Sequence, residues 1–259
     1  MTITAHQPIF HLMIRLALAS LFLTGALTAE PTGPPTEPTP SAEPATERPN
    51  VTDLGDGNYQ VGLVTFNKTT RQISFPTELN MDEGLLEYAI VHENGKIHEA
   101  LLHTKARPFH INLALKLLRY KASEELFQIL DEDYKPTGKY PEIPEAIRTA
   151  ARIEILLAWK TPEGKDVRAT LNELITNTVT EAPMTASHWV YGGSYLHEGR
   201  FTAETSGDIA AIFTSSSSLF NYPGKAREDD TIWIPTPKRT PLPGTKVTVT
   251  IQPLAPAKN

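Results

Sequence analysis

The sequence contains no cysteine, and this absence excludes several classes of protein. Without thiols the chain forms no disulfide and binds neither a Cys-ligated zinc ion nor an iron–sulfur cluster held by thiolates. A bacterial lipoprotein anchor, which needs a cysteine at the cleavage site, is excluded as well. We predict no cofactor. A domain without disulfides depends on its hydrophobic core, for which about 210 residues are enough.

Blocks of basic residues are also missing. The formal net charge is −6, and no run of Lys and Arg is interleaved with aromatic residues. Proteins that bind nucleic acid carry such basic surfaces, so we expect no nucleic-acid partner. The sequence has one long apolar run, near its start, and no second one that would predict a further membrane span.

The apolar run, Leu16–Ala29, follows Arg15 and ends in small residues, as a secretory signal peptide does. It is about 14 residues long, whereas a helix that spans a bilayer needs roughly 20. We therefore predict a signal peptide over residues 1–29 and an exported protein, periplasmic or extracellular. The alternative is an uncleaved signal that anchors the chain, and this is the only membrane attachment we expect.

Residues 30–50 are predicted to form a disordered linker. Seven of these 21 positions are proline, and none is a large apolar residue. A segment of this composition buries too little surface to offset its chain entropy, and it forms an extended, semi-rigid spacer. It either tethers the following domain at a distance from a surface or merely separates the signal from the domain.

Residues 51–254 are predicted to form one α+β domain, with residues 255–259 as a tail. The clearest expected hairpin joins 85–92 to 96–103 through Asn94-Gly95, a dipeptide that favours a type I′ turn. In that register His92 faces Ile97. A helix is expected from Pro108 to Leu118, with Ile111, Ala114, Leu115 and Leu118 on one apolar face. Further strands are expected at 152–159, 166–169 and 246–252. Hairpins dominate, so we expect a largely antiparallel sheet with one main amphipathic helix.

Histidines and glutamates are concentrated around the expected hairpin, and this composition raises the possibility of a metal site. The string from His98 to His103 resembles HExxH but is one residue too long, and on a strand the two histidines would face opposite sides. The hairpin alone therefore does not assemble a site. The alternative is a structural role in which His98 and Glu99 hydrogen-bond to neighbouring loops. The residues concerned are Glu87, His92, His98, Glu99, His103 and His110.

Three other positions are candidates for function. Arg107 is expected to pair with Glu99 at the corner between strand and helix. The segment Trp189–Ser194 contains a Gly-Gly pair, and Ser194 is a candidate nucleophile although it lies in no G-x-S-x-G motif. Asp230 is a candidate ligand for a metal, together with His98 and Glu99. A structural reading is open for each: a strand end with core packing for the tryptophan segment, and a solvated turn for Asp230.

The same residues carry a resemblance to a family. The stretch from Gly84 to Glu87, the string Gly95-Lys-Ile-His-Glu99, and Pro108 with its helix resemble the YdjY-type domain of exported bacterial proteins. Similar stretches continue through Trp189–Ser194, Phe201–Glu204, Gly207-Asp208, Asp230 and Pro243–Thr245. The family is uncharacterised, so the resemblance implies little about function. Some relatives carry iron–sulfur labels, which this chain cannot match through thiolates.

Two function classes remain. The first is a non-enzymatic binding or interaction module of the cell envelope, whose partner is an unknown envelope protein or small ligand. The second is a metal-binding protein or a hydrolase-type enzyme that uses His98 and Glu99, with Glu87 and Ser194 as further candidate catalytic residues. Whether the chain is an enzyme is left open by the sequence.

Overall fold

A computed structural model describes residues 49–255 of the chain. The predicted signal peptide and nearly all of the predicted linker lie outside the described residues. The part that is described is mostly β-structure and only about 14% helical. None of its helices combines the length and the apolar character needed to cross a membrane.

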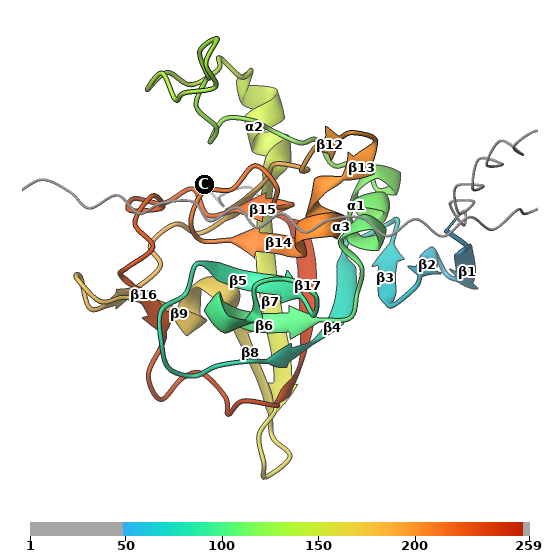
Figure 1. The fold of residues 1–259 in the computed structure, drawn as a ribbon. Helices are drawn as coiled ribbons and strands as arrows, with labels where there is room; N and C mark the ends of the chain where they lie inside the picture. The colour runs from blue at the N-terminus through green and yellow to red at the C-terminus, as the bar shows by residue number, and fades with distance from the viewer. Residues whose placement is uncertain (1–48, 256–259) are drawn as a thin grey trace, which may run out of the picture. The chain divides into compact units, whose positions relative to one another are not determined.

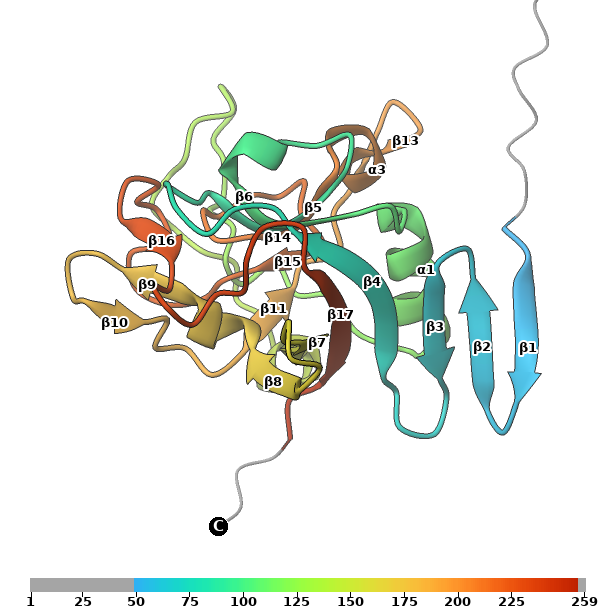
Figure 2. The same cartoon turned by 90° about the horizontal axis from the view of Figure 1, so that it is seen from below.

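Eight strands form a closed barrel (Figures 1 and 2). The ring closes because β6 pairs with β5 on one edge and with β4 on the other. Two pairs of adjacent strands, β5–β6 and β14–β15, are parallel. The other pairs in the ring are antiparallel. In order around the barrel the strands are β4 (Ile73–Leu79), β17 (Lys246–Pro253), β7 (Arg152–Lys160), β11 (Trp189–Tyr191), β15 (Phe220–Asn221), β14 (Asp208–Ala211), β5 (Tyr88–His92) and β6 (Ala100–Thr104).

The prediction of an α+β domain with a main helix was therefore wrong. Closure depends on contacts between strands that are distant in the sequence, such as β14 with β5 and β17 with β4. Hydrophobic alternation shows that a segment is a strand but not which strand it pairs with. The helix that dominates the sequence pattern is one short element packed beside the barrel.

Four more strands extend the barrel sheet. β1 (Val51–Gly55), β2 (Asn58–Val61) and β3 (Val64–Asn67) continue outward from β4, and β8 (Asp166–Thr170) pairs with β7. Figure 2 shows the first three side by side at one flank of the molecule. Two small sheets contain the remaining strands, which are β9 (Ile175–Asn177), β10 (Ala182–Pro183) and β16 (Trp233–Pro235) in one, and β12 (Leu196–His197) and β13 (Arg200–Phe201) in the other.

The longest helix is α1 (Pro108–Leu117), and it confirms the helix expected from Pro108. Ile111, Ala114 and Leu115 are buried, as their spacing predicted. The Tyr191 hydroxyl donates a hydrogen bond of 2.5 Å to Asn112 Oδ1 and so ties β11 to the helix. The other helical segments are η1 (Ile97–Glu99), α2 (Glu145–Ala151), η2 (Leu171–Leu174) and α3 (Thr202–Ser206).

The main core fills the barrel and extends to elements beside it, such as β3 and α1. On the long strands it is built by strict alternation. On β7 the odd-numbered residues from Ile153 to Trp159 are buried, and the even-numbered residues face outward. β17 alternates in the same way, with Val247, Val249 and Ile251 buried. These two strands confirm the strands expected at 152–159 and 246–252. Their outward residues form an outer face, which is described below.

The hairpin predicted at Asn94-Gly95 does not form. β5 and β6 run parallel, with Tyr88 beside Ala100 and His92 beside Thr104, so His92 does not face Ile97. Neither Asn94 nor Gly95 has the positive φ that a type I′ turn needs. Gly95 instead permits a close backbone approach, because a Cβ built on Gly207 would lie 2.7 Å from Gly95 Cα. Glycine is needed at position 95 because Gly207 leaves little space for a side chain there, and not because of the geometry of a turn.

From the close approach of Gly95 and Gly207 we predict the loss of stability that a methyl group at position 207 causes. Both Gly207 and Gly164 have φ +80°, but a Cβ on Gly164 has no neighbour within 4 Å. Gly164→Ala should cost about 1 kcal/mol for its backbone conformation alone. Gly207→Ala should cost about 1–3 kcal/mol more, because the methyl group forces Gly95 away. Urea denaturation measures both free energies of unfolding, and equal losses would show that the Gly95–Gly207 contact is not tight.

Candidate functional site

Three of the sequence candidates and one neighbour, Lys96, gather at the start of β5 and around η1, in a group that we call the carboxylate cluster: Glu87, Lys96, His98 and Glu99. The Lys96 ammonium lies 3.3 Å from Glu87 Oε2 and 3.4 Å from Glu99 Oε2. His98 Nε2 lies 3.1 Å from Glu99 Oε1. The backbone fixes the pair, since Glu87 N–H donates to the Glu99 carbonyl at 3.0 Å.

The two carboxyl groups have pKa values shifted in opposite directions. Burial, and then a hydrogen bond to Glu99, raise the pKa of Glu87, and Lys96 opposes them only in part. Burial would also raise the pKa of Glu99, but its hydrogen bond with Glu87 and the charges of Lys96 and His98 lower it overall. Two adjacent carboxyl groups with separated pKa values are the arrangement that general acid–base chemistry uses. The cluster is also an ordinary surface ion-pair network, because the His98 side chain is 77% exposed.

Arg107 does not pair with Glu99, so that prediction was wrong. Its guanidinium lies 2.5 Å from Glu204 Oε1, and the other Glu204 oxygen accepts the Phe109 N–H at 2.9 Å. Glu204 thus supplies the first turn of α1 with an acceptor that the sequence of α1 lacks. Glu204 lies far from Arg107 along the chain, and no local pattern indicated that the two residues pair.

Three other sequence candidates have no contact with the carboxylate cluster among the hydrogen bonds and ion pairs of residues 49–255: Ser194, Trp189 and Asp230. The Ser194 hydroxyl accepts the Ala203 N–H at 3.1 Å, which fixes the start of α3. Trp189 is fully buried in the core, and its indole N–H donates to Asn172 Oδ1 at 2.8 Å. Asp230 is exposed in a turn. The contacts of Ser194 and Trp189 are those of structural residues.

The remaining histidines are also separate. His92 Nδ1 accepts the Asn94 N–H at 3.3 Å. His103 lies on β6 opposite Glu78, and its Nδ1 has no partner among residues 49–255. His110 packs against Gly62, and burial together with the Arg107 charge lowers its pKa. Within the described residues, no group of three or more His, Asp or Glu side chains is placed to hold a metal ion. The proposed metal ligands His98, Glu99 and Asp230 stay a prediction.

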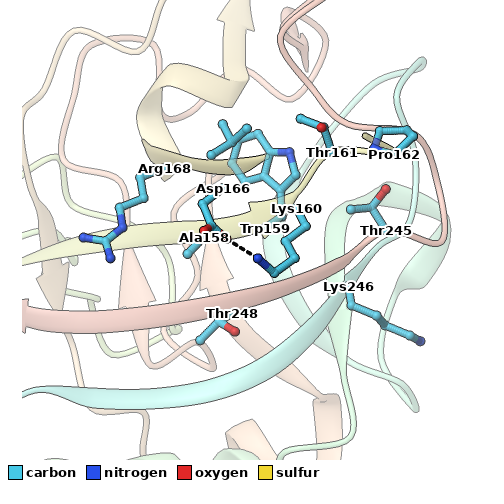
Figure 3. Close-up of a pocket in the computed structure, with 11 residues that line it drawn as sticks. Ala158, Trp159, Lys160, Thr161, Pro162, Asp166, Arg168, Thr245, Lys246 and Thr248 are labelled. Atoms are coloured by element: carbon cyan, nitrogen blue, oxygen red, sulfur yellow. Dashed lines mark hydrogen bonds and ion pairs between the residues drawn. The ribbon is translucent and has the colours of Figure 1, made fainter. Parts of the chain in front are cut away.

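The sequence reasoning missed a groove on the outer face of the barrel, which we call the outer groove. It has a volume of about 660 Å³ and lies over β17, β7 and β8, beside the turn that joins β7 to β8 (Figure 3). Thr248, Ala158 and Arg168 are paired neighbours on three adjacent strands at the floor of the groove. Ala158 has only a methyl group, so longer side chains around it form the walls. The sequence indicated which residues of β7 and β17 face outward. It did not indicate that these two strands pair and so form one surface.

Cations outnumber anions in the outer groove. Lys160, Arg168 and Lys246 line it, and Asp166 is the one acidic side chain among the lining residues. Lys160 pairs with Asp166 at 2.7 Å, and Lys246 pairs with Glu78 of β4. Arg168 forms no ion pair with any residue in the described part of the chain, and Figure 3 shows it at the end of the groove away from Lys246.

The raised pKa of Glu87 predicts how replacing this residue changes the free energy of unfolding at different pH values. The pKa of Glu87 is raised in the folded state. The neutral side chain therefore stabilises the fold below the pKa that Glu87 has in the unfolded chain. This stabilisation is lost as the pH rises through the pKa of the folded state. Glu87→Gln keeps a neutral group at every pH, so the variant should gain stability relative to wild type between pH 4 and pH 7. Urea denaturation at both pH values measures the gain. A relative loss of stability at pH 7 would show that the ion pair with Lys96 outweighs burial.

Comparison with known protein families identifies this chain's family. The family model of the YdjY domain matches residues 64–252, which is most of the chain and includes all eight barrel strands except the last residue of β17. No curated protein matches the chain. No solved structure matches it either. The matched range confirms the resemblance that the sequence motifs indicated, and the chain belongs to the YdjY domain family.

Proposed function

We propose that this member of a family of unknown function is a non-enzymatic binding module of the cell envelope, exported by its N-terminal signal and held at a distance by its proline-rich linker. The observation that carries the proposal is the outer groove. It lies across three neighbouring strands and is lined by charged, hydroxyl-bearing and small side chains, so it suits an extended partner. A binding surface on a closed barrel needs no moving part, because the strands below it are fixed.

The floor of the outer groove is rigid for a specific reason. β17 pairs with β4 along Lys246–Ile251 and with β7 along Val247–Pro253. Beneath it the side chains of Val247, Val249 and Leu157 are packed in the core. A surface that is ordered before binding loses little conformational entropy when a partner docks, and this favours recognition.

Blocking the outer groove tests the proposal. Thr248→Trp places a large ring over Ala158 without changing charge, whereas Thr52→Trp places the same ring on the exposed strand β1. The full chain should sediment with envelope fragments of a Gram-negative bacterium. Thr248→Trp should reduce the bound fraction at least about fivefold, which corresponds to roughly 1 kcal/mol.

The Thr52→Trp control should bind as wild type does, and unchanged thermal unfolding should show that both variants fold. The proposal fails if the wild-type chain does not sediment with the fragments, or if both tryptophan variants bind equally well.

The adjacent carboxyl groups of Glu87 and Glu99, whose pKa values are raised and lowered respectively, favour a second candidate, a hydrolase-type enzyme with Glu87 as the general acid and Glu99 as the base. His98 would then orient Glu99 through their 3.1 Å contact. This candidate requires hydrolysis of an ester or glycoside that is lost in Glu99→Gln and retained in Thr248→Trp. The cluster lies outside the outer groove, so the two variants separate the candidates.

A further inference from the structure

We propose that the outer groove binds an acidic polysaccharide strand, an inference that rests on the binding function proposed above. The groove has a volume of about 660 Å³, and its lining combines three kinds of side chain. These are cations with few local anions, threonine hydroxyls, and an alanine that leaves space between them. Each kind restricts the class of ligand.

The charges select an anionic ligand. The chain as a whole carries a net charge of −6, yet the outer groove is lined by Lys160, Arg168 and Lys246 against Asp166. Lys160 is paired with Asp166 and Lys246 with Glu78 of β4, so Arg168 is the cation that a ligand would neutralise. Arg168 has no ion-pair partner in the described part of the chain, and its charge helps to lower the pKa of Asp166 after the larger effect of Lys160. A guanidinium without a partner offers a planar set of donors that matches a carboxylate.

The hydroxyl groups suit a sugar. Thr161, Thr245 and Thr248 line the outer groove, and Thr250 continues the row of outward threonines along β17. A hydroxyl both donates and accepts hydrogen bonds, as the hydroxyls of a polysaccharide do. A second hollow with a volume of about 470 Å³ shares Ala158 and Arg168 with the first, so the surface continues along β7 and β8. Such a continuous track fits a strand rather than a single sugar.

The pairing of the strands disfavours an acidic peptide. Peptides that bind to sheets commonly add a strand to an open edge and gain main-chain hydrogen bonds. Along the floor of the outer groove β17 is paired with β4 and β7, and β7 is paired with β17 and β8. The floor therefore offers side chains only. β8, at the rim, pairs with β7 alone among the described strands, so a peptide could add a strand only there, and poly-L-glutamate tests that mode of binding.

A neutral polysaccharide is disfavoured because no aromatic platform faces the ligand. Trp159 is the one aromatic residue in the lining, and it is 9% exposed and belongs to the core. Stacking on exposed rings is a main source of affinity where charge is absent. Binding in the outer groove should therefore depend on charge and weaken as salt screens it.

The test uses the full chain and three probes: polygalacturonate, the neutral polymer dextran, and poly-L-glutamate. Isothermal titration calorimetry should detect binding to polygalacturonate at low salt, with much weaker binding to the other two. Arg168→Ala should weaken the affinity about fivefold, and Arg168→Glu should weaken it further. Arg200→Ala removes an exposed arginine from β13, outside the groove, and should leave the affinity unchanged.

The outcomes separate this inference from the function on which it rests. Equal affinity for poly-L-glutamate, or an affinity for polygalacturonate that Arg168→Glu does not change, would overturn the polysaccharide assignment. If polygalacturonate does not bind while Thr248→Trp still reduces sedimentation with envelope fragments, the ligand class is wrong and the binding module stands. If neither experiment depends on the groove, both proposals fail.

Discussion

The closure of the barrel by β6 is the constraint on which the rest of the structure depends. β6 is held between β5 and β4, and side chains just after β4 and at the end of β6 secure the second contact. The Asn80 amide donates to the carbonyls of Ile97 and Ala100, and the Thr104 hydroxyl donates to the carbonyl of Pro76 at 2.5 Å. A closed ring has no open edges of its own, so each barrel strand has its backbone groups satisfied without another molecule.

Closure also determines where ligands can be recognised. The interior is filled by the core, including fully buried Trp189, Tyr191 and Phe220, and is not available as a ligand cavity. Recognition must then use the outside of the barrel or the loops at its ends. The outer groove lies over β17 and β7, which are paired on both sides, whereas the carboxylate cluster combines Glu87, just before β5, with the segment that joins β5 to β6. The first site is held more rigidly, and this is the physical reason to place binding there.

The sequence predicted local elements well and their partners poorly. Periodicity located α1, β7 and β17, because one buried face is a property of the segment alone. Pairing is a property of two distant segments, so the parallel arrangement of β5 and β6 was mistaken for a hairpin. The Asn94-Gly95 dipeptide strengthened that error, because Gly95 serves a contact with Gly207 that is more than 100 residues away.

The candidate site shows the same division. Glu87, His98 and Glu99 were chosen from sequence and lie together, since they flank one strand and one short loop. Ser194 and Arg107 were chosen by type, and their partners Ala203 and Glu204 are fixed only by the folded chain. The outer groove combines side chains from three strands and two distant parts of the chain, and no motif in the sequence marks it.

A double-cysteine experiment tests barrel closure most directly, and the native chain has no cysteine to interfere. Glu78 of β4 and His103 of β6 are paired residues at the closing contact. The variant Glu78→Cys/His103→Cys should form an intramolecular disulfide on mild oxidation, because paired positions lie within the reach of such a bond. His92→Cys/Ile97→Cys, which a hairpin at Asn94-Gly95 would place side by side, should not. A disulfide in the second variant and none in the first would contradict the closed barrel.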